Sequence, residues 1–383
     1  MRFLISAGEA SGELYGAQLI TALKQRLSGS AFFGVGGEQM RAAGCETVVD
    51  SSRLSVVGIT EILAHLPRIY GDFRRLLRAA DQRRPDAAIV IDSPAFNFRV
   101  AREMHRRGVP VIYYVCPQLW AWRERRVERF HQWVRKALVI FPFEEQWYRD
   151  RGVDAEYVGH SLADLPPFAT TRAEFAAGNR LDPERPWIAL LPGSRAREVQ
   201  MILPALLQAL DLLPADVRLG HEFVLPVAST LDSAWMREQV ARHTSVEPPR
   251  ELRLVEDAGA ALAHARAAVV ASGTATVEAA LAGTPMVVVY RVSPMTWRLG
   301  RGLLRVPFVA MPNLIAGRQI VPELLQSEFT AANVARELGL LLADGPAREK
   351  MLDGLAGVQA RLRARGAQPA PERAAEAVVR ALV

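Results

Sequence analysis

Cysteine and lysine are scarce in this chain of 383 residues. The first scarcity excludes a disulfide-rich protein, and the second leaves arginine as the main basic residue. Cysteine occurs only at Cys45 and Cys116. A single optional pair is no disulfide scaffold, so a reduced, cytoplasmic setting is expected. Lysine occurs at three positions, which leaves arginine to supply 44 of the 47 basic residues. Arginine is the better bidentate partner for phosphate, although coding bias alone also produces such an excess.

Long hydrophobic runs and several familiar motifs are also missing. No segment approaches the roughly 18 apolar residues of a membrane-spanning helix. The first apolar run is about five residues, against roughly 7–15 in a signal peptide. Although the net charge is +6, zinc-ligand spacing and RNA-binding signatures are absent, so no nucleic-acid partner is expected. A Walker A motif is absent, and so is the Asp-x-Asp triplet that would hold a divalent cation on a diphosphate, so neither a metal nor another cofactor is expected.

What the sequence does contain is a regular alternation of short apolar runs with helical patterns. This alternation predicts parallel sheets with helices on both faces. It pauses at residues 161–186, a stretch with four prolines that we interpret as an inter-domain linker. The fold expected is α/β, with two tandem Rossmann-like doubly wound domains facing across a cleft, the GT-B arrangement; a two-domain dehydrogenase is the competitor. Strands are predicted at residues 2–7, 31–35, 87–91, 111–115, 137–141 and 155–158, and then at 187–191, 222–226, 253–255, 267–271 and 286–290.

Two turns in the second half have the composition of anion sites. Each follows a predicted strand and opens a helix, so backbone N–H groups and the positive end of the helix point at a ligand. An arginine in the first turn could hold a diphosphate, and a glutamate one helical turn into the second could accept both ribose hydroxyls. An ordinary turn and a carboxylate on the helix dipole are the alternatives. The predicted substrate-binding residues here are Gly193, Ser194 and Arg195, then Ser272, Gly273, Thr274 and Glu278.

Acidic residues follow two predicted strands of the first half. Asp92 closes the strand at 87–91 and is placed to act as a general base, unless it only caps the next helix. Glu9 follows the first strand and offers a second catalytic carboxylate. Ser11 and Gly12 in the same turn offer N–H donors to a substrate, or else a plain helix cap.

Residues 113–123 are unusually aromatic for the end of a strand, and three arginines follow closely. Aromatics beside arginines suit a sugar or phosphate surface, or a membrane interface; core packing is the alternative. Cys116 lies in this run, but no adjacent base would activate it as a nucleophile. His160 either enters the cleft or supports a turn.

Together these motifs resemble the lipid-A-disaccharide synthase family from the first strand to about residue 326. Three matches carry substitutions: Glu13 stands where Asp is usual, Ala95 replaces a second acid after Asp92, and Cys116 replaces a Ser. The motifs lie at residues 8–13, 92–97, 113–123, 141–144, 159–160, 191–195, 271–278, 290–291 and 312–317.

The resemblance implies an inverting transfer of 2,3-diacylglucosamine from its UDP derivative to 2,3-diacylglucosamine 1-phosphate (lipid X). Asp92 would be the base, Arg195 and Asn313 would hold the donor, and Glu278 its ribose. Residues 1–168 would bind the acceptor and lipid, residues 169–350 the UDP-sugar, and helices at 351–383 would pack back on the domains. A related UDP-sugar transferase acting on another lipid acceptor, a UDP-sugar 2-epimerase and a non-catalytic binding protein are the alternatives.

Lipid substrates imply peripheral contact with the cytoplasmic surface of the inner membrane, and a homodimer is left open. Apolar residues recur at helical spacing through residues 59–78, where Pro67 predicts a division into two helices. An apolar stripe with arginines around it is typical of an interfacial helix, and a core-facing helix is the alternative. Residues 297–305 are a second candidate. The predicted membrane residues are Arg68, Arg74, Arg75 and Arg78.

Overall fold

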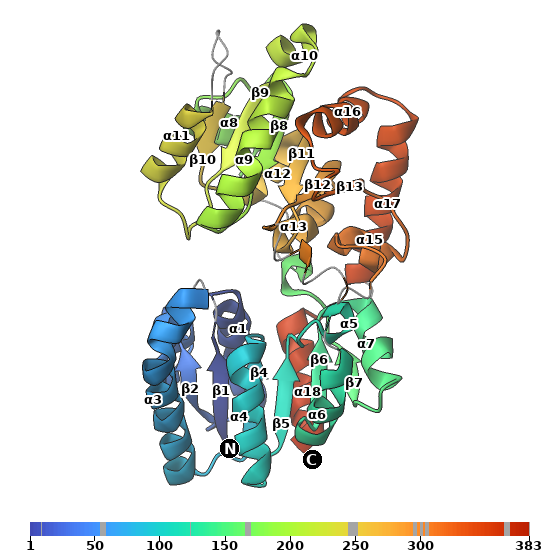
Figure 1. The fold of residues 1–383 in the computed structure, drawn as a ribbon. Helices are drawn as coiled ribbons and strands as arrows, with labels where there is room; N and C mark the ends of the chain where they lie inside the picture. The colour runs from blue at the N-terminus through green and yellow to red at the C-terminus, as the bar shows by residue number, and fades with distance from the viewer. Residues whose placement is uncertain are drawn as a thin grey trace. The chain divides into compact units, whose positions relative to one another are not determined.

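Two units, each built around one parallel β-sheet, make up the chain (Figure 1). The computed structural model describes residues 1–8, 10–53, 59–122, 124–164, 170–243, 252–293, 297–298, 302, 306–363 and 368–382. Unit 1 comprises Met1–Asp164 and Leu362–Val383, and unit 2 comprises Leu165–Arg361. Among the described helices, none combines the length and the apolar character needed to cross a membrane.

Unit 1 contains a sheet that runs, in the described residues, through seven strands in the order β3-β2-β1-β4-β5-β6-β7. Its strands are β1 (Arg2–Ala7), β2 (Ala31–Gly36), β3 (Cys45–Asp50), β4 (Ala87–Ile91), β5 (Val111–Tyr114), β6 (Lys136–Val139) and β7 (Ala155–Tyr157). Its helices are α1 (Ala10–Arg26), α2 (Glu38–Ala42), α3 (Ile59–Arg83), α4 (Pro94–Arg106), α5 (Leu119–Trp122), α6 (Val127–Trp133), α7 (Pro142–Arg149) and α18 (Ala370–Leu382), with short 3-10 turns at Ser51–Arg53, Glu124–Arg126 and Ser161–Asp164.

Helices cover both faces of this sheet. Alternate strand residues such as Leu4, Val90 and Tyr113 pack in one core with α3, α4 and α6. Their neighbours point to the other face, where Tyr114 meets Tyr15 of α1 edge to face and α18 lies against α1 (Figure 1). Burial on both faces explains why β4 reads as an unbroken apolar run, with all five residues buried.

Unit 2 repeats the plan with strand order β10-β9-β8-β11-β12-β13 in its described part. Helices α9 and α16 pack on one side of the sheet, and α8, α12 and α13 on the other (Figure 1). The strands are β8 (Trp187–Leu191), β9 (Glu222–Pro226), β10 (Leu252–Val255), β11 (Ala265–Ala271), β12 (Met286–Tyr290) and β13 (Glu323–Leu325). The helices are α8 (Arg172–Asn179), α9 (Ala196–Asp211), α10 (Ala215–Gly220), α11 (Ser233–Arg242), α12 (Ala258–His264), α13 (Thr274–Ala282), α15 (Met311–Ala316), α16 (Ala331–Leu342) and α17 (Pro346–Arg363).

Each sheet has one point where the order of strands reverses. In unit 1 the chain moves outward from β1 to β3 and then returns to place β4 on the other side of β1. In unit 2 the same reversal places β11 beside β8. Ligands of open α/β sheets bind at the carboxyl ends of the strands at such points. The fold therefore directs attention to the residues after β1, β4, β8 and β11.

The last helix returns to unit 1. Tyr157 donates to the carbonyl of Leu362 (2.9 Å), and Arg373 donates to the carbonyl of Val158 (2.7 Å). The Ala370 N–H also donates to the Asp164 carboxylate. These bonds at the end of β7 fix α18 on the sheet that the chain left some 200 residues earlier, and the predicted return of the C-terminal helices therefore ends on unit 1.

Three expectations about local structure were wrong. The boundary between the units does fall inside the expected linker at 161–186, between Asp164 and Leu165, but that stretch also contains helix α8, which Thr171 and Glu174 open with a reciprocal capping box. Pro67 lies inside one continuous helix, α3, rather than dividing it. A proline removes one helical hydrogen bond, and packing of the later turns on the core holds the helix together. Strands β3 and β13 were missed, because one is a partly exposed edge strand and the other spans three residues.

Candidate active site

In unit 1 the order of strands reverses between β1 and β4, and this place is the first switch point; the second is the reversal between β8 and β11 in unit 2. The first switch point brings the turn after β1 against the turn after β4. Ala7 and Ile91 are paired neighbours at the ends of these strands. A Cβ atom placed on Gly8 would lie 2.6 Å from Ser93 Oγ, closer than real Cβ contacts allow. Gly8 is therefore needed for the close approach of the two turns, and it places the start of α1 beside Asp92.

Asp92 occupies a strained turn. Its φ is 47° and that of Ser93 is 44°, a left-handed conformation that costs about 1–2 kcal/mol per non-glycine residue. Val115, at the end of the neighbouring strand β5, has φ 55°, which is rarer still for a β-branched residue. Such strain persists where surrounding contacts enforce it, and it gathers at functional sites. The half-buried Asp92 side chain thus sits on backbone that the fold holds away from its preferred conformation.

Asn97 supplies much of that enforcement. Its fully buried amide donates to the carbonyl oxygens of Ile91 (2.8 Å) and Asp92 (2.9 Å), and its Oδ1 accepts the Ser6 hydroxyl (2.7 Å). Tyr113 adds a second donor to the Asp92 carbonyl at 2.8 Å. The sequence singled out the motif at 92–97 without giving Asn97 a role; the structure makes it a positioning residue for Asp92.

Tyr15 and His160 form a buried pair at this edge of the sheet. The Tyr15 hydroxyl lies 3.5 Å from the His160 ring nitrogens, and His160 Nδ1 accepts the Leu162 N–H at 3.2 Å. Burial lowers the pKa of His160 to about 4, so the ring is neutral near pH 7. Burial, with the charges of Tyr114 and Asp92, raises the pKa of Tyr15 well above its ordinary value. The turn-supporting interpretation of His160 fits these contacts.

Three of the aromatic residues at 113–123 belong to the core rather than to the surface. Tyr113, Tyr114 and Trp120 are at most 5% exposed, so the interpretation of these three residues as a sugar or membrane surface was wrong. Trp120 donates to Glu144, whose carboxylate also accepts the Phe141 N–H, at 3.0 and 3.1 Å. Burial raises the pKa of Glu144 to about 7.

Two further residues of unit 1 now have structural settings. Burial also raises the pKa of the Cys116 thiol, in keeping with its expected lack of nucleophilic character. Glu13 accepts the Gln39 N–H at 2.8 Å and so anchors the start of α2.

Of the predicted residues in the first turn, Glu9 lies outside the described residues, and only the backbone of Ser11 is described. A Cβ atom placed on Gly12 would meet Ala7 and Ile91 only at ordinary van der Waals distances, so close packing does not require glycine there.

The second switch point carries Gly193, Ser194 and Arg195 directly after β8. Gly193 has φ 119°, and a Cβ there would meet the Glu198 side chain at 2.7 Å. Glu198 accepts the Ser194 N–H at 3.2 Å and an Arg195 guanidinium N–H at 3.1 Å. Ser194 and Arg195 therefore already hold a carboxylate at the start of α9. Glu198 was missed by the sequence analysis, although its position in the first helical turn was a readable signal.

The turn after β11 lies beside this one, since β8 and β11 are neighbours. Gly273 and Thr274 are exposed at the start of α13, whose first N–H groups have no partner within the helix. Ser272 is committed to the fold, because its N–H donates to Val289 and its hydroxyl to Val309. Glu278 is half-buried, and in the described part of the chain its carboxylate has no hydrogen-bond or ion-pair partner. Burial raises its pKa.

Asn313 is fully buried and fully bonded. Its Oδ1 accepts the N–H groups of Ile320 (2.7 Å) and Val321 (2.9 Å), and its amide donates to the Val321 carbonyl and to Glu323. A direct bond to a donor sugar would require one of these to break. The geometry fits a positioning role for Asn313 better than the direct contact expected from sequence.

The predicted membrane helix is α3, of which the second half is described in full. Ile69, Phe73, Leu76 and Leu77 pack against the unit 1 core, so this half of the apolar stripe is the core-facing alternative. The side chains of Ile59, Ile62, Leu63 and Leu66 lie outside the described residues. Tyr70 is 60% exposed, and the four predicted arginines, Arg68, Arg74, Arg75 and Arg78, are exposed along the same helix.

Metal ligands do not gather anywhere in the described residues: no group of three or more His, Cys, Asp or Glu side chains could hold an ion. At the second switch point the cationic partner for an anion is the Arg195 guanidinium. The arrangement can thus bind a phosphate ester at unit 2 and present a carboxylate at unit 1.

Solved structures share this fold. The glycotransferase of kitacinnamycin aligns with a TM-score of 0.65 and 18% identity over 100% of this chain and 99% of its own. The UDP-GlcNAc 2-epimerase from Neisseria meningitidis aligns with a TM-score of 0.66 and 13% identity over 95% and 98%. These likenesses place the fold among two-domain GT-B proteins, as expected, and at such identities they show the fold alone.

Sequence relatives are far closer. A lipid-A-disaccharide synthase from Koribacter versatilis is 53% identical over 99% of this chain and 98% of its own length. One from Myxococcus xanthus is 43% identical over 100% and 97%. The model of the lipid-A-disaccharide synthetase family matches residues 3–378. The expected resemblance is confirmed, and the chain belongs to the lipid-A-disaccharide synthetase family.

Proposed function

We propose that this chain transfers 2,3-diacylglucosamine from its UDP derivative to 2,3-diacylglucosamine 1-phosphate, giving a β-1,6-linked disaccharide 1-phosphate and UDP. The observation that carries the proposal is the set of side chains that the two switch points present. One presents Asp92 on an enforced, strained turn, and at the other Ser194 and Arg195 each donate to one oxygen of the Glu198 carboxylate. Family membership supplies the identity of the two sugars.

In the proposed reaction Asp92 removes the proton from the acceptor 6-hydroxyl. The oxygen then bonds to C1 of the donor sugar while the bond from C1 to the diphosphate oxygen breaks, and that electron pair leaves with UDP. One carboxylate base and no covalent intermediate give inversion at C1. The backbone at Asp92 is fixed by Asn97 and Tyr113, so little reorganisation is needed to bring the base to the hydroxyl.

Unit 2 binds UDP in this proposal. The donors that now hold Glu198 pass to the diphosphate, since phosphate carries more charge than a carboxylate and matches the arginine fork. The exposed N–H groups at Gly273 and Thr274 bind the same anion. Glu278, half-buried and without a protein partner among the described residues, accepts the ribose hydroxyls. Asn313 holds residues 320–323 in place through its buried amide.

The proposal includes peripheral binding to the cytoplasmic surface of the inner membrane and assigns acceptor binding to unit 1. It is supported by the acyl chains of both substrates and by the exposed arginines of α3. The proposal leaves the homodimer open, and light scattering of the purified protein distinguishes it from a monomer.

The deciding experiment is incubation with UDP-2,3-diacylglucosamine and lipid X, followed by mass spectrometry. We expect the disaccharide 1-phosphate and one equivalent of UDP, and no consumption of UDP-sugar when lipid X is left out. Conversion of a UDP-sugar without acceptor would identify a 2-epimerase instead. Transfer only to another lipid acceptor would identify a related transferase, and UDP binding without turnover would identify a binding protein.

A further inference from the structure

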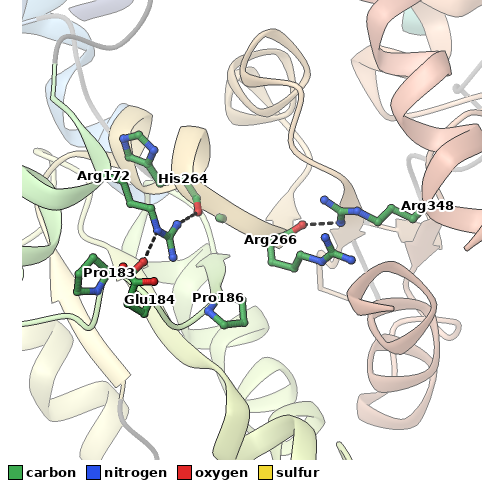
Figure 2. A pocket seen from close by; sticks show the side chains of 8 residues that line it. Arg172, Pro183, Glu184, Pro186, His264, Arg266 and Arg348 are labelled. Carbon is green, nitrogen blue, oxygen red and sulfur yellow. Dashed lines mark hydrogen bonds between the residues drawn. The ribbon is translucent and has the colours of Figure 1, made fainter. Parts of the chain in front are cut away.

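A hollow of about 400 Å³ lies at the amino ends of the unit 2 strands (Figure 2). Its lining includes Arg172, Glu184, Pro186, His264, Arg266 and Arg348. Pro186 directly precedes β8, and Arg266 is the second residue of β11. The proposed UDP-binding turns follow the carboxyl ends of these same strands. At about 3.3 Å per residue, strands of five to seven residues separate the two places by roughly 17–23 Å.

Arg266 and Arg348 bring two positive charges together in this hollow. The Nη1 atom of Arg348 donates to the carbonyls of Arg266 (2.7 Å) and Leu341 (2.8 Å), and Figure 2 shows the two guanidinium groups side by side. Burial and the neighbouring charge of Arg266 lower the pKa of Arg348. Arg266 pairs with Asp344 at 2.5 Å, but that carboxylate is 90% exposed. In the described part of the chain no carboxylate lies within ion-pair distance of Arg348.

Unused donors remain on both groups. Arg348 donates only through Nη1, so its Nε and Nη2 have no hydrogen-bond partner among the described residues. Arg266 spends Nε on Leu342 and Nη2 on Asp344, which leaves Nη1. Two guanidinium groups with free N–H donors, one shielded only by an exposed carboxylate, form an arrangement that an oxyanion would stabilise.

Arg172 closes the other side of the hollow and has a different task. It donates to the carbonyls of Pro183, His264 and Arg185, and its guanidinium lies 3.8 Å from the centre of the Trp187 ring. These bonds use three of its five N–H donors and fix its position. Arg172 therefore adds a third, immobile positive charge to the rim.

We propose that this hollow is a second anion site, distinct from the UDP site, and that it binds a phosphate group through Arg266 and Arg348. The ligand is a phosphate monoester or inorganic phosphate, because a tetrahedral dianion meets two converging arginines and a third charge nearby. Both a free phosphate and the headgroup of an anionic lipid present this chemistry.

The test is calorimetric titration of the whole protein with inorganic phosphate in saturating UDP. Saturation blocks the proposed UDP site, and UDP affinity is measured separately, so failure of the proposed function and failure of this inference are distinguishable. We expect the parent to bind phosphate, Arg348→Gln to bind about ten- to hundredfold more weakly, and Arg348→Lys to recover part of the loss. Arg336→Gln, which removes an exposed arginine on α16, is the matched control and should bind like the parent.

Variants that are expected to bind phosphate more tightly distinguish a lost site from an unfolded protein, because unfolding can only weaken binding. Asp344→Asn removes the carboxylate that shields Arg266, and Glu184→Gln removes an exposed acid from the rim, so each should tighten phosphate binding severalfold. Soluble dihexanoyl phosphatidate distinguishes the sources: tighter binding than phosphate indicates a lipid headgroup, and equal binding indicates free phosphate. The inference is overturned if the UDP-saturated parent binds neither probe, or if Arg348→Gln and Asp344→Asn bind phosphate as the parent does.

Discussion

Single residues at strand ends determine what the two units present to a ligand. Asp92 and Ser93 adopt left-handed backbone at the end of β4, and the buried Asn97 amide bonds the carbonyls on either side of that turn. A residue that costs energy to hold in place, and that the fold holds with several bonds, is a candidate for chemistry rather than for stability.

Replacement of Asp92 tests the proposed base. Asp92→Asn keeps the size of the side chain and removes its basicity, so turnover should fall by about 10²–10⁴, the usual contribution of a general base. UDP affinity and the circular dichroism spectrum should stay those of the parent. Asp154→Asn, which alters an exposed ion pair with Lys136, is the control and should remain active. Near-normal turnover of Asp92→Asn would remove this residue from the mechanism.

Glu278 should make UDP binding depend on pH. Burial raises its pKa, and ribose hydroxyls donate to the ionised carboxylate, so UDP affinity should fall as the pH is lowered through that raised pKa. Loss of hydrogen bonds to a charged group, about 1.5–3 kcal/mol, predicts roughly ten- to hundredfold weaker binding by Glu278→Gln. Calorimetry from pH 5 to pH 8 measures both effects. If parent and variant share one pH profile, Glu278 does not contact the nucleotide.

Among the elements, α5 and α7 are joined by a buried acid. Glu144 lies in the first turn of α7, accepts the Trp120 N–H of α5 and accepts the Phe141 N–H that precedes its own helix. Its capping bonds favour the ionised form, but complete burial outweighs them and sets its pKa at about 7. This contact therefore titrates in the physiological range.

The free energy of unfolding should depend on pH through the titration of Glu144. The folded pKa of about 7 lies above the ordinary 4.5, so its contribution is present below pH 4.5 and is lost, by about 3 kcal/mol, as the pH rises to 7. His160 acts in the opposite sense, since its pKa near 4 lowers stability as the pH falls below 6.5. The difference in unfolding free energy between parent and Glu144→Gln, measured in urea from pH 4 to pH 8, isolates Glu144. A pH-independent difference would contradict the burial argument.

Helix α3 divides its residues between core and solvent. In its described half the apolar side chains pack on unit 1, while the arginines and Tyr70 face out. Near an anionic surface each arginine contributes on the order of 1 kcal/mol, and Arg75 less, because Asp72 lies 3.8 Å away. Replacement of Arg68, Arg74, Arg75 and Arg78 by Ser should therefore weaken sedimentation with anionic vesicles by about two to three orders of magnitude at low salt, with UDP affinity intact.

The control for α3 is a variant with the same loss of charge elsewhere. Four exposed arginines, Arg41, Arg106, Arg336 and Arg380, can be changed to Ser together. If this control loses as much vesicle binding as the α3 variant, the attraction is a property of net charge rather than of one helix. If neither loses binding, the contact lies elsewhere, with residues 297–305 as the next segment to test.

At the scale of the whole molecule, the proposed mechanism assigns stabilisation of the leaving diphosphate to arginine and helix ends. The sequence has no Asp-x-Asp triplet, and the described residues include no cluster of three metal-binding side chains. Turnover should therefore persist in excess chelator. Activity that chelator abolishes and magnesium or manganese restores would contradict this, and Arg195→Gln offers a parallel test, with a loss of UDP affinity expected.

Much of this architecture could be read from the order of residues. Strands buried on both faces are continuous apolar runs, so β4, β8 and β12 were predictable from composition alone. The glycine turns and Asp92 were predictable because each directly follows a strand in the sequence, and in parallel sheets ligands bind at the carboxyl ends of strands. The edge strand β3 and helix α8 were not, since their signals were a mixed pattern and a single capping box among prolines.

The sequence by itself determined the two doubly wound units, the positions of the glycine turns and the family, because these depend on local pattern and on motifs in fixed order. Only the tertiary structure decided which side chains meet. Ser6 donates to Asn97, Tyr113 donates to the Asp92 carbonyl, and Arg348 donates to the Arg266 carbonyl, and each of these bonds joins residues from separate strands, turns or helices. Such contacts depend on strand order and burial, which set distances and pKa values in three dimensions and leave no periodic trace along the chain.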